Sequence, residues 1–177
     1  MQFILVTYLL LLVSCGTVSQ VKNQEGTAKN SFSSSKFSME LNTVDGKTFS
    51  FESIRGKKYL VVAFWATWCE PCKDELKQLA LMYPQFSDKI EFVAVSTDGE
   101  DLIDNVTEFA AENSLPFPVL LDPSGNFVAS VMPGGNSVPY LMIILKDGTV
   151  YSKHSGYKPG DEISLKKELE NLLEKKK

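Results

Sequence analysis

The feature that most constrains the fold is a pair of cysteines, two residues apart, where a buried strand is expected to give way to a helix. An apolar run, residues 59–65, precedes the motif, and apolar residues at helical spacing follow it. The motif is Cys69-Glu70-Pro71-Cys72. The first turn of a helix has unpaired backbone N–H groups and the positive end of the dipole, and both stabilise a thiolate, the reactive form of cysteine. Pro71 suits this turn because it has no N–H to leave unpaired.

The two cysteines could instead form a structural disulfide or half of a zinc site, attach haem, or serve a peroxidase. Zinc usually takes four ligands, and Cys15 and His154 are the other candidates, so the sequence does not favour zinc. Covalent haem attachment needs a histidine where the chain has Lys73. A peroxiredoxin-type peroxidase needs Pro and Thr where the chain has Val62 and Ala66. A redox-active dithiol is the favoured interpretation, and a structural disulfide stays as the alternative.

Apolar residues elsewhere predict a sheet with helices on its faces. Two runs without polar alternation, residues 59–65 and 90–96, are typical of central strands in an α/β sheet. A helix between them makes these strands parallel, with a right-handed crossover. Alternation over residues 36–42, followed by a turn at Asp45-Gly46 and a return over 48–51, predicts an N-terminal hairpin. Further strands are expected at residues 117–121, 140–145 and 149–154, the last as an antiparallel edge.

Three segments carry apolar residues at helical spacing. The first covers residues 71–83, and Pro84 is expected to end or kink it. The others cover residues 100–113 and 161–174, with a short helical turn expected at 126–131. The inward-facing residues expected in the two later helices are Leu102, Val106, Phe109 and Ala110, and Ile163, Leu165, Leu169 and Leu172.

Length and charge bound the function. A chain of 177 residues with 44 % hydrophobic side chains suits one domain with a core of its own. A net charge of −4 does not concentrate Lys and Arg for phosphate binding, so no nucleic-acid partner is expected. Three cysteines are too few for a disulfide scaffold.

The stretch Trp68-Cys69-Glu70-Pro71-Cys72-Lys73-Asp74-Glu75 resembles the active site of the thioredoxin superfamily. More narrowly, it resembles the membrane-tethered bacterial thiol–disulfide oxidoreductases of the TlpA/ResA type, and the resemblance extends over about residues 36–175. It implies an α/β thioredoxin fold, a central mixed sheet flanked by helices, with an N-terminal β-hairpin and a central helix–strand insertion. Thiol–disulfide exchange needs neither a metal nor an organic cofactor, so none is expected.

Exchange chemistry assigns a role to each cysteine. Cys69 lies nearer the end of the strand, so we expect it to be exposed and to attack a substrate disulfide. Cys72 would then resolve the mixed disulfide and leave a redox-active Cys69–Cys72 disulfide. Glu75 lies three residues after Cys72 on the same helical face. Proteins of the TlpA/ResA type have a Glu here that is assigned to proton transfer, while thioredoxin itself has a buried Asp at the place of Ala63. A surface carboxylate is the alternative for Glu75.

The resemblance also implies a surface for the substrate chain. In the superfamily a cis proline lies opposite the CxxC motif and offers backbone groups to an extended substrate. Val138-Pro139 matches that position, and a trans proline at a strand start is the alternative. Tyr140 departs from the Thr common in the family, so contacts there are expected to differ. The residues expected to complete this surface are Trp68, Glu70 and Pro71.

The N-terminus resembles that of a bacterial lipoprotein. The apolar run 3–13 is too short to span a bilayer, which takes about 20 residues, and fits the centre of a secretory signal. It ends in Leu12-Val13-Ser14-Cys15-Gly16, which resembles a lipobox, although no Lys or Arg precedes the run. We expect a signal peptide over 1–14, a lipidated Cys15 and flexible tether over 15–35, and a thioredoxin-like domain over 36–177. An ordinary cleaved signal or an uncleaved anchor are the alternatives.

These features predict a lipid-anchored reductase of protein disulfides in the bacterial cell envelope, facing the periplasm or the cell exterior. Cytochrome c maturation is one use of such proteins. The expected partners are a disulfide-containing protein substrate, the membrane through the lipid anchor, and a membrane electron donor of thioredoxin-reducing type; the chain itself is expected to be a monomer. The alternatives are an envelope oxidase or isomerase in the manner of DsbA or DsbC, and a non-catalytic binding module with a static disulfide.

Replacing Cys15 with Ser tests the lipid anchor. Because acyl chains on Cys15 would hold the protein at the membrane, we expect Cys15→Ser to move it to the soluble fraction after cell fractionation. Ser14→Ala keeps the cysteine and is the matched control, which should stay with the membranes. A Cys15→Ser protein that still partitions with membranes contradicts the anchor.

Overall fold

The computed structural model describes residues 32–132 and 137–174. The predicted signal peptide, Cys15 and the tether through residue 31 lie outside the described residues. The strands are β1 Glu40–Thr43, β2 Thr48–Ser50, β3 Tyr59–Trp65, β4 Ile90–Ser96, β5 Val119–Leu121, β6 Tyr140–Ile144 and β7 Val150–Ser155. The helices are α1 Ser34–Phe37, α2 Glu70–Phe86, α3 Ile103–Glu112, α4 Asn126–Val131 and α5 Asp161–Glu174, with 3-10 turns η2 Phe51–Ser53 and η3 Glu100–Leu102.

All the strands join one mixed sheet in the order β2-β1-β5-β4-β3-β6-β7. Strand β3 pairs in parallel with β4 and antiparallel with β6, and β7 is an antiparallel edge, as predicted. The N-terminal hairpin extends the sheet because β1 pairs with β5. This is the predicted α/β thioredoxin-type arrangement, with α3, β5 and α4 as the insertion between β4 and β6.

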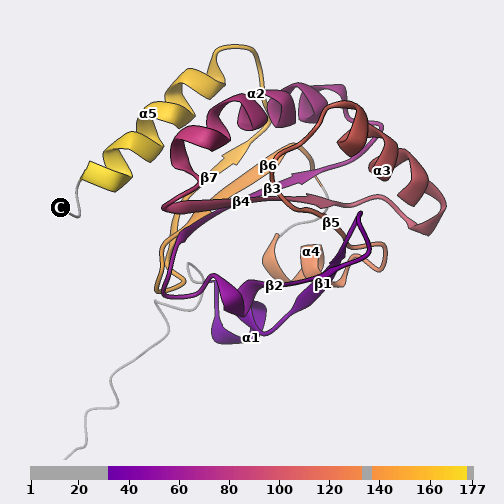
Figure 1. Cartoon of the computed structure of the whole chain (residues 1–177), viewed down its shortest axis with the longest axis horizontal. Coiled ribbons are helices and arrows are strands. Elements are labelled where there is room, and N and C mark those ends of the chain that lie inside the picture. Colours follow the sequence, from indigo (N-terminus) through magenta and orange to yellow (C-terminus); the bar gives the residue numbers. More distant parts are fainter. Residues whose placement is uncertain (1–31, 133–136, 175–177) are drawn as a thin grey trace, which may run out of the picture.

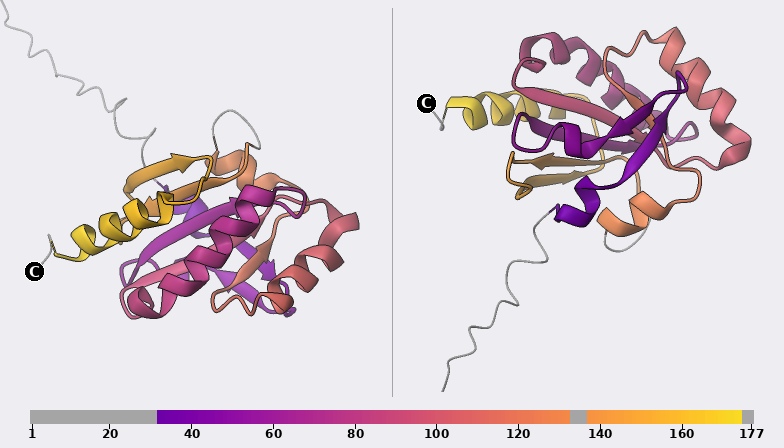
Figure 2. Two further views of the ribbon diagram at one scale, coloured as in Figure 1. Left: turned by 90° about the horizontal axis from the view of Figure 1, so that it is seen from above. Right: turned by 60° about the horizontal axis from the view of Figure 1, so that its bottom comes forward.

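Helices cover both faces of the sheet. Helices α2 and α5 lie on one face, with α1 and α4 on the other (Figure 1). The views of Figure 2 show α2 and α5 side by side, in agreement with their direct contacts. Two separate apolar cores result, one under α2, α3 and α5 and one under α1, η2 and α4.

Strand β3 supplies side chains to both cores. Val61, Ala63 and Trp65 face the core under α2, whereas Leu60 and Phe64 face the opposite core. Side chains alternate across a strand, so a strand that is covered on both faces must be apolar at every position. That requirement explains the unbroken apolar run before the cysteine motif.

The N-terminal boundary of the folded part differs from the prediction. Residues 34–37 form helix α1 and the strand begins only at Glu40, so the strand predicted over 36–42 is wrong in its first half. Phe32 and Phe37 are both 2 % exposed, with ring centroids 4.9 Å apart, and Phe32 N–H donates to the Gly148 carbonyl at 2.7 Å. The predicted domain start at residue 36 is therefore too late, because burial of Phe32 outweighs the polar serines around it.

Two details of the helices also differ. Helix α2 continues through Pro84 to Phe86, where the sequence predicted an end or kink. Pro84 falls in the last turn and removes only one hydrogen bond, while Phe86 is 2 % exposed and anchors that turn in the core. Ile163, predicted to face inward, is 70 % exposed, because it lies off the face of α5 that buries Leu165 and Leu169.

Within residues 32–132 and 137–174, no helix is both long enough and apolar enough to cross a membrane.

Candidate active site

The two cysteines lie at the junction that the sequence predicted. Strand β3 ends at Trp65, and Cys69 is the N-cap residue of α2. Cys69 and Cys72 form a disulfide with an S–S distance of 2.04 Å and a Cα–Cα distance of 5.3 Å. The Cys72 N–H also donates to Cys69 Sγ at 3.3 Å, so an orphan donor of the first turn points at the sulfur. The site can therefore stabilise negative charge on Cys69 once the disulfide opens.

Cys69 is more buried than the sequence suggested. It is 5 % exposed and Cys72 is 0 % exposed, so the expected exposure of Cys69 is wrong for the oxidised form. The reason is that Cys69 Sγ turns back toward the helix, where it is bonded to Cys72 and caps the first turn. Cys69 nevertheless remains the more accessible of the two sulfur-bearing residues.

The residues around the two cysteines are mostly exposed, and two of them form an ion pair. Trp68 is 66 % exposed and directly precedes Cys69, a placement that suits contact with another chain. Pro71 and Glu70 are also exposed. The Glu70 carboxylate accepts a hydrogen bond from Lys73 Nζ at 2.8 Å, which lowers the pKa of Glu70. Lys73 is therefore held by Glu70.

The Val138–Pro139 peptide bond is cis. Pro139 leads into β6, and β6 pairs antiparallel with β3 so that Tyr140 lies opposite Phe64. This register places Pro139 at the end of β3 from which the chain runs to Cys69. The Pro139 carbonyl accepts a hydrogen bond from Gly156 N at 2.8 Å. The preceding loop residues 133–136 lie outside the described residues.

Glu75 is buried one helical turn after Cys72. It is 6 % exposed, and its carboxyl group has no hydrogen-bond partner within the described part of the chain. Burial, and then the negative charge of Asp161, raise the pKa of Glu75 to about 7. The surface-carboxylate alternative is thus excluded, and Glu75 can exist in both protonation states near neutral pH. Ala63, at the place of the thioredoxin Asp, is 1 % exposed.

The structure adds a site residue that sequence reasoning missed. Asp98 is 4 % exposed and follows β4. Its carboxylate accepts hydrogen bonds from the Thr67 N–H at 2.9 Å, the Thr67 hydroxyl at 2.8 Å and the Ser96 hydroxyl at 2.7 Å. These bonds fix the turn that carries Trp68 and Cys69. The available signal was a set of polar residues directly after a buried parallel strand, at the sheet edge where β3 also ends.

Among the described residues, no group of three or more His, Cys, Asp and Glu side chains is placed to hold a metal ion.

The chain matches a known protein family. The model of the AhpC/TSA family matches residues 35–153. The chain belongs to this family. Within it, the chain is 34 % identical over 157 residues to the thioredoxin-like protein YneN of Bacillus subtilis (strain 168), covering 88 % of this chain and 82 % of YneN. It is 30 % identical over 133 residues to the thiol-disulfide oxidoreductase ResA of Bacillus thuringiensis subsp. konkukian (strain 97-27), covering 75 % of this chain and 70 % of ResA.

A solved structure agrees with these relatives. The crystal structure of StoA from Bacillus subtilis aligns with a TM-score of 0.60 at 26 % identity, covering 73 % of this chain and 93 % of StoA. The resemblance to the TlpA/ResA type is confirmed, and so is the thioredoxin-type fold. With its own Cys69–Cys72 disulfide, this AhpC/TSA family member is a thiol–disulfide oxidoreductase.

Replacing Glu75 with Gln should change how stability depends on pH. The pKa of Glu75 is about 7 in the folded chain, above the ordinary value of 4.5 for a glutamate, so ionisation of Glu75 opposes folding. The contribution of Glu75 to the free energy of unfolding is fully present below pH 4.5 and is lost as the pH rises through about 7. Gln cannot ionise, so Glu75→Gln should gain up to about 3 kcal/mol on the wild type between pH 4.5 and 8 in urea unfolding. Glu108→Gln, an exposed change on α3, is the control and should follow the wild type at every pH.

Replacing Asp98 with Ala should leave buried donors at Thr67 and Ser96 without acceptors. We expect a loss of about 2–3 kcal/mol in unfolding free energy and slower reduction of a protein disulfide, because the turn carrying Cys69 is no longer fixed. Asp101→Ala, which removes an exposed carboxylate three residues later, is the matched control. Equal effects of the two substitutions on rate would show that Asp98 does not position the site.

Proposed function

We propose that this chain is a lipid-anchored reductase of protein disulfides in the bacterial cell envelope. The observation that carries the proposal is the Cys69–Cys72 disulfide at the N-terminus of α2, with the Val138–Pro139 segment at the same end of β3. These features supply a nucleophile, a resolving thiol and a place for an extended substrate chain. Disulfide exchange by a dithiol uses the first two, and the third would serve to bind a protein substrate.

The reaction balances as an exchange of two electrons and two protons. In the reduced enzyme, Cys69 Sγ attacks one sulfur of the substrate disulfide, and the other substrate sulfur leaves and takes up a proton. Cys72 Sγ then attacks Cys69 Sγ, which forms the Cys69–Cys72 disulfide and releases the second substrate thiol. The substrate disulfide is reduced and the enzyme dithiol is oxidised.

Glu75 is the proposed acid–base group for the second step. Cys72 is 0 % exposed, so its thiol needs a nearby base to become a nucleophile. Glu75 lies one helical turn away with a pKa of about 7, which suits transfer of a proton in either direction near neutral pH.

The surroundings of the cysteines favour reduction over oxidation. A strong oxidant stabilises its thiolate, often with a neighbouring cation. Here Glu70 stands between the cysteines, and the cation that follows them, Lys73, is already paired with Glu70 at 2.8 Å. Trp68, Glu70, Pro71 and the Val138–Pro139 segment form the proposed contact surface for the substrate protein.

The location and partners follow from the same chemistry. Relatives named thiol-disulfide oxidoreductase ResA support an envelope role, and a lipidated Cys15 would hold the domain at the membrane. After each turnover the disulfide must be reduced again, so we propose a membrane electron donor of thioredoxin-reducing type. Cytochrome c maturation is the proposed use, with reduced cysteines of the apoprotein as the product. The proposed oligomeric state is a monomer.

The reduction potential of the Cys69–Cys72 pair tests the direction of exchange. We expect a value of about −270 mV or lower, near that of thioredoxin, because Glu70 lies between the cysteines and the neighbouring cation, Lys73, is paired with Glu70. The measurement equilibrates the full-length chain carrying Cys15→Ser with thiol–disulfide buffers, so that the CxxC pair provides the only thiols. A value of about −120 mV, near that of DsbA, would make the chain an oxidant and contradict the proposal.

Single cysteine substitutions check the assigned roles in the same background. Cys72→Ala should trap a mixed disulfide between Cys69 and the substrate, whereas Cys69→Ala should not. Full disulfide-reducing activity of Cys69→Ala with loss in Cys72→Ala would reverse the assignment.

A further inference from the structure

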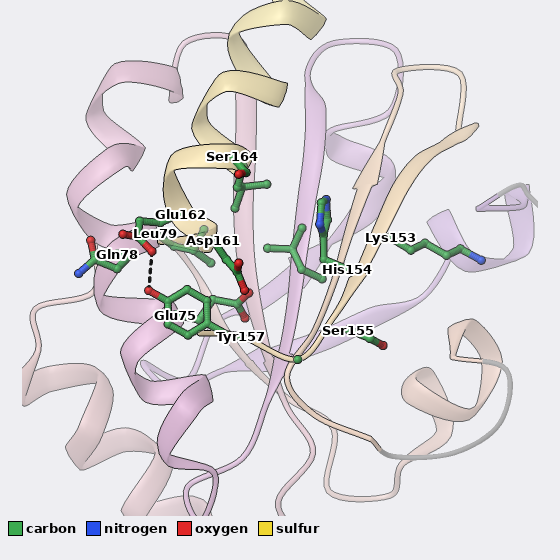
Figure 3. Close-up of a pocket in the computed structure, with 13 residues that line it drawn as sticks. Glu75, Gln78, Leu79, Lys153, His154, Ser155, Tyr157, Asp161, Glu162 and Ser164 are labelled. Atoms are coloured by element: carbon green, nitrogen blue, oxygen red, sulfur yellow. Dashed lines mark hydrogen bonds between the residues drawn. The ribbon is translucent and has the colours of Figure 1, made fainter. Parts of the chain in front are cut away.

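A cavity of about 350 Å³ lies beside Glu75, between α2, the end of β7 and the start of α5 (Figure 3). Its buried floor includes Glu75, Leu79 and Leu165. Its mouth includes Ser155 and Ser164, both exposed. The cavity therefore runs from solvent down to the one carboxyl group that the proposed exchange uses.

Glu75 lines this cavity and is only 6 % exposed. Its carboxyl group has no hydrogen-bond partner in the described parts of the chain. A buried carboxyl group of this kind needs a proton or a hydrogen-bond donor, and the cavity is large enough for water to provide one. Neither Cys69 nor Cys72 lines the cavity. Glu75 thus has the cysteines one helical turn away and a separate opening to solvent.

Besides Glu75, five charged or titratable side chains line this cavity, and four of them are paired or turned away. Tyr157 O–H donates to Glu162 at 2.8 Å, and His154 is hydrogen-bonded to Glu168, outside the cavity, at 2.8 Å. Figure 3 shows Lys153 pointing away from Glu75. The fifth is Asp161.

Asp161 accepts only a backbone hydrogen bond within the described part of the chain, from Lys158 N at 3.0 Å. Its carboxyl group lies with that of Glu75 in the cavity (Figure 3). A negative charge beside a buried carboxyl group favours the protonated form of that group and so strengthens it as a base. In this pair the more buried residue is Glu75.

We propose that this cavity is the route by which Glu75 exchanges its proton with solvent, and that Asp161 is the positioning residue whose negative charge makes Glu75 a stronger base for that proton. This inference rests on the proposed role of Glu75 in exchange. Glu75 in its ionised form takes the proton of the Cys72 thiol when Cys72 attacks, and then releases it through the cavity to water. In the reverse direction, water in the cavity supplies the proton. Burial and Asp161 together raise the pKa of Glu75, so both transfers occur near neutral pH.

Carboxyl ¹³C NMR of the full-length Cys15→Ser chain in its oxidised form tests the role of Asp161. Asp161→Asn removes the charge and keeps the size, so the titration midpoint of Glu75 should fall by at least about 0.5 pH. Asp74→Asn removes an exposed charge next to Glu75 in sequence but outside the cavity, and should leave the midpoint in place. An unchanged midpoint in Asp161→Asn, or an equal fall in both variants, would overturn the inference. If Asp161→Asn does not fold, Asp161→Ser keeps a residue suited to a helix start and replaces it.

Blocking the mouth tests the route. Ser164→Phe places a ring at the opening, whereas Ile163→Phe adds similar bulk at the neighbouring position, which is 70 % exposed and outside the lining. We expect Ser164→Phe to slow protein-disulfide reduction by roughly threefold to tenfold, a part of what an acid–base group contributes. Ile163→Phe should not slow it. In a Glu75→Gln background Ser164→Phe should have no further effect. Equal rates in the two Phe variants, or the same loss with and without Glu75, would rule out the route.

The two readouts separate this inference from the proposed function. The NMR midpoint needs no turnover, so it reports on Asp161 even if the chain reduces no protein disulfide. If Glu75→Gln leaves the pH profile of reduction unchanged while Asp161→Asn still lowers the midpoint, the proposed role of Glu75 fails and the electrostatic role of Asp161 stands. If Glu75→Gln alters the profile and Asp161→Asn leaves the midpoint in place, the proposed function stands and the inference fails.

Discussion

Burial of β3 on both faces is the constraint on which the rest of the structure depends. Its side chains fill one core under α2 and another under α4, so the strand cannot shift by one residue without exchanging the two cores. This fixes where β3 ends, at Trp65, and therefore where the chain turns into α2. The disulfide lies at that turn because Cys69 is the N-cap of the helix. Asp98 holds the same turn from the neighbouring strand.

The three acidic residues of the candidate active site differ in burial and in hydrogen bonding. Glu70 is exposed and paired with Lys73. Asp98 is buried and saturated by hydrogen bonds from Thr67 and Ser96. Glu75 is buried and has no hydrogen-bond partner among the described residues, and its pKa rises to about 7. Glu70 is held by its ion pair and Asp98 fixes the geometry of the turn, whereas Glu75 has a pKa at which it can change its protonation state during exchange.

Sequence patterns predicted the central elements well and the boundaries less well. Strands β3 and β4 and helix α5 begin and end where their apolar patterns do, because burial decides those positions directly. The errors occurred where a local rule competed with packing. Phe32 and Phe37 fold a serine-rich segment onto the core, and Phe86 carries α2 past Pro84. A polar composition and a helix breaker were each outweighed by buried aromatic rings.

The sequence by itself determined the redox motif, its place between a strand and a helix, and the family to which the chain belongs. Those properties are local, since they need only the order and spacing of neighbouring residues. The tertiary structure decided the rest of the site. Asp98 and Asp161 lie far along the chain from Cys69 and Glu75, and they meet only because β4 pairs with β3 and α5 packs beside α2. Burial, shared cavities and long-range hydrogen bonds depend on that packing, which no spacing of residues along the chain encodes.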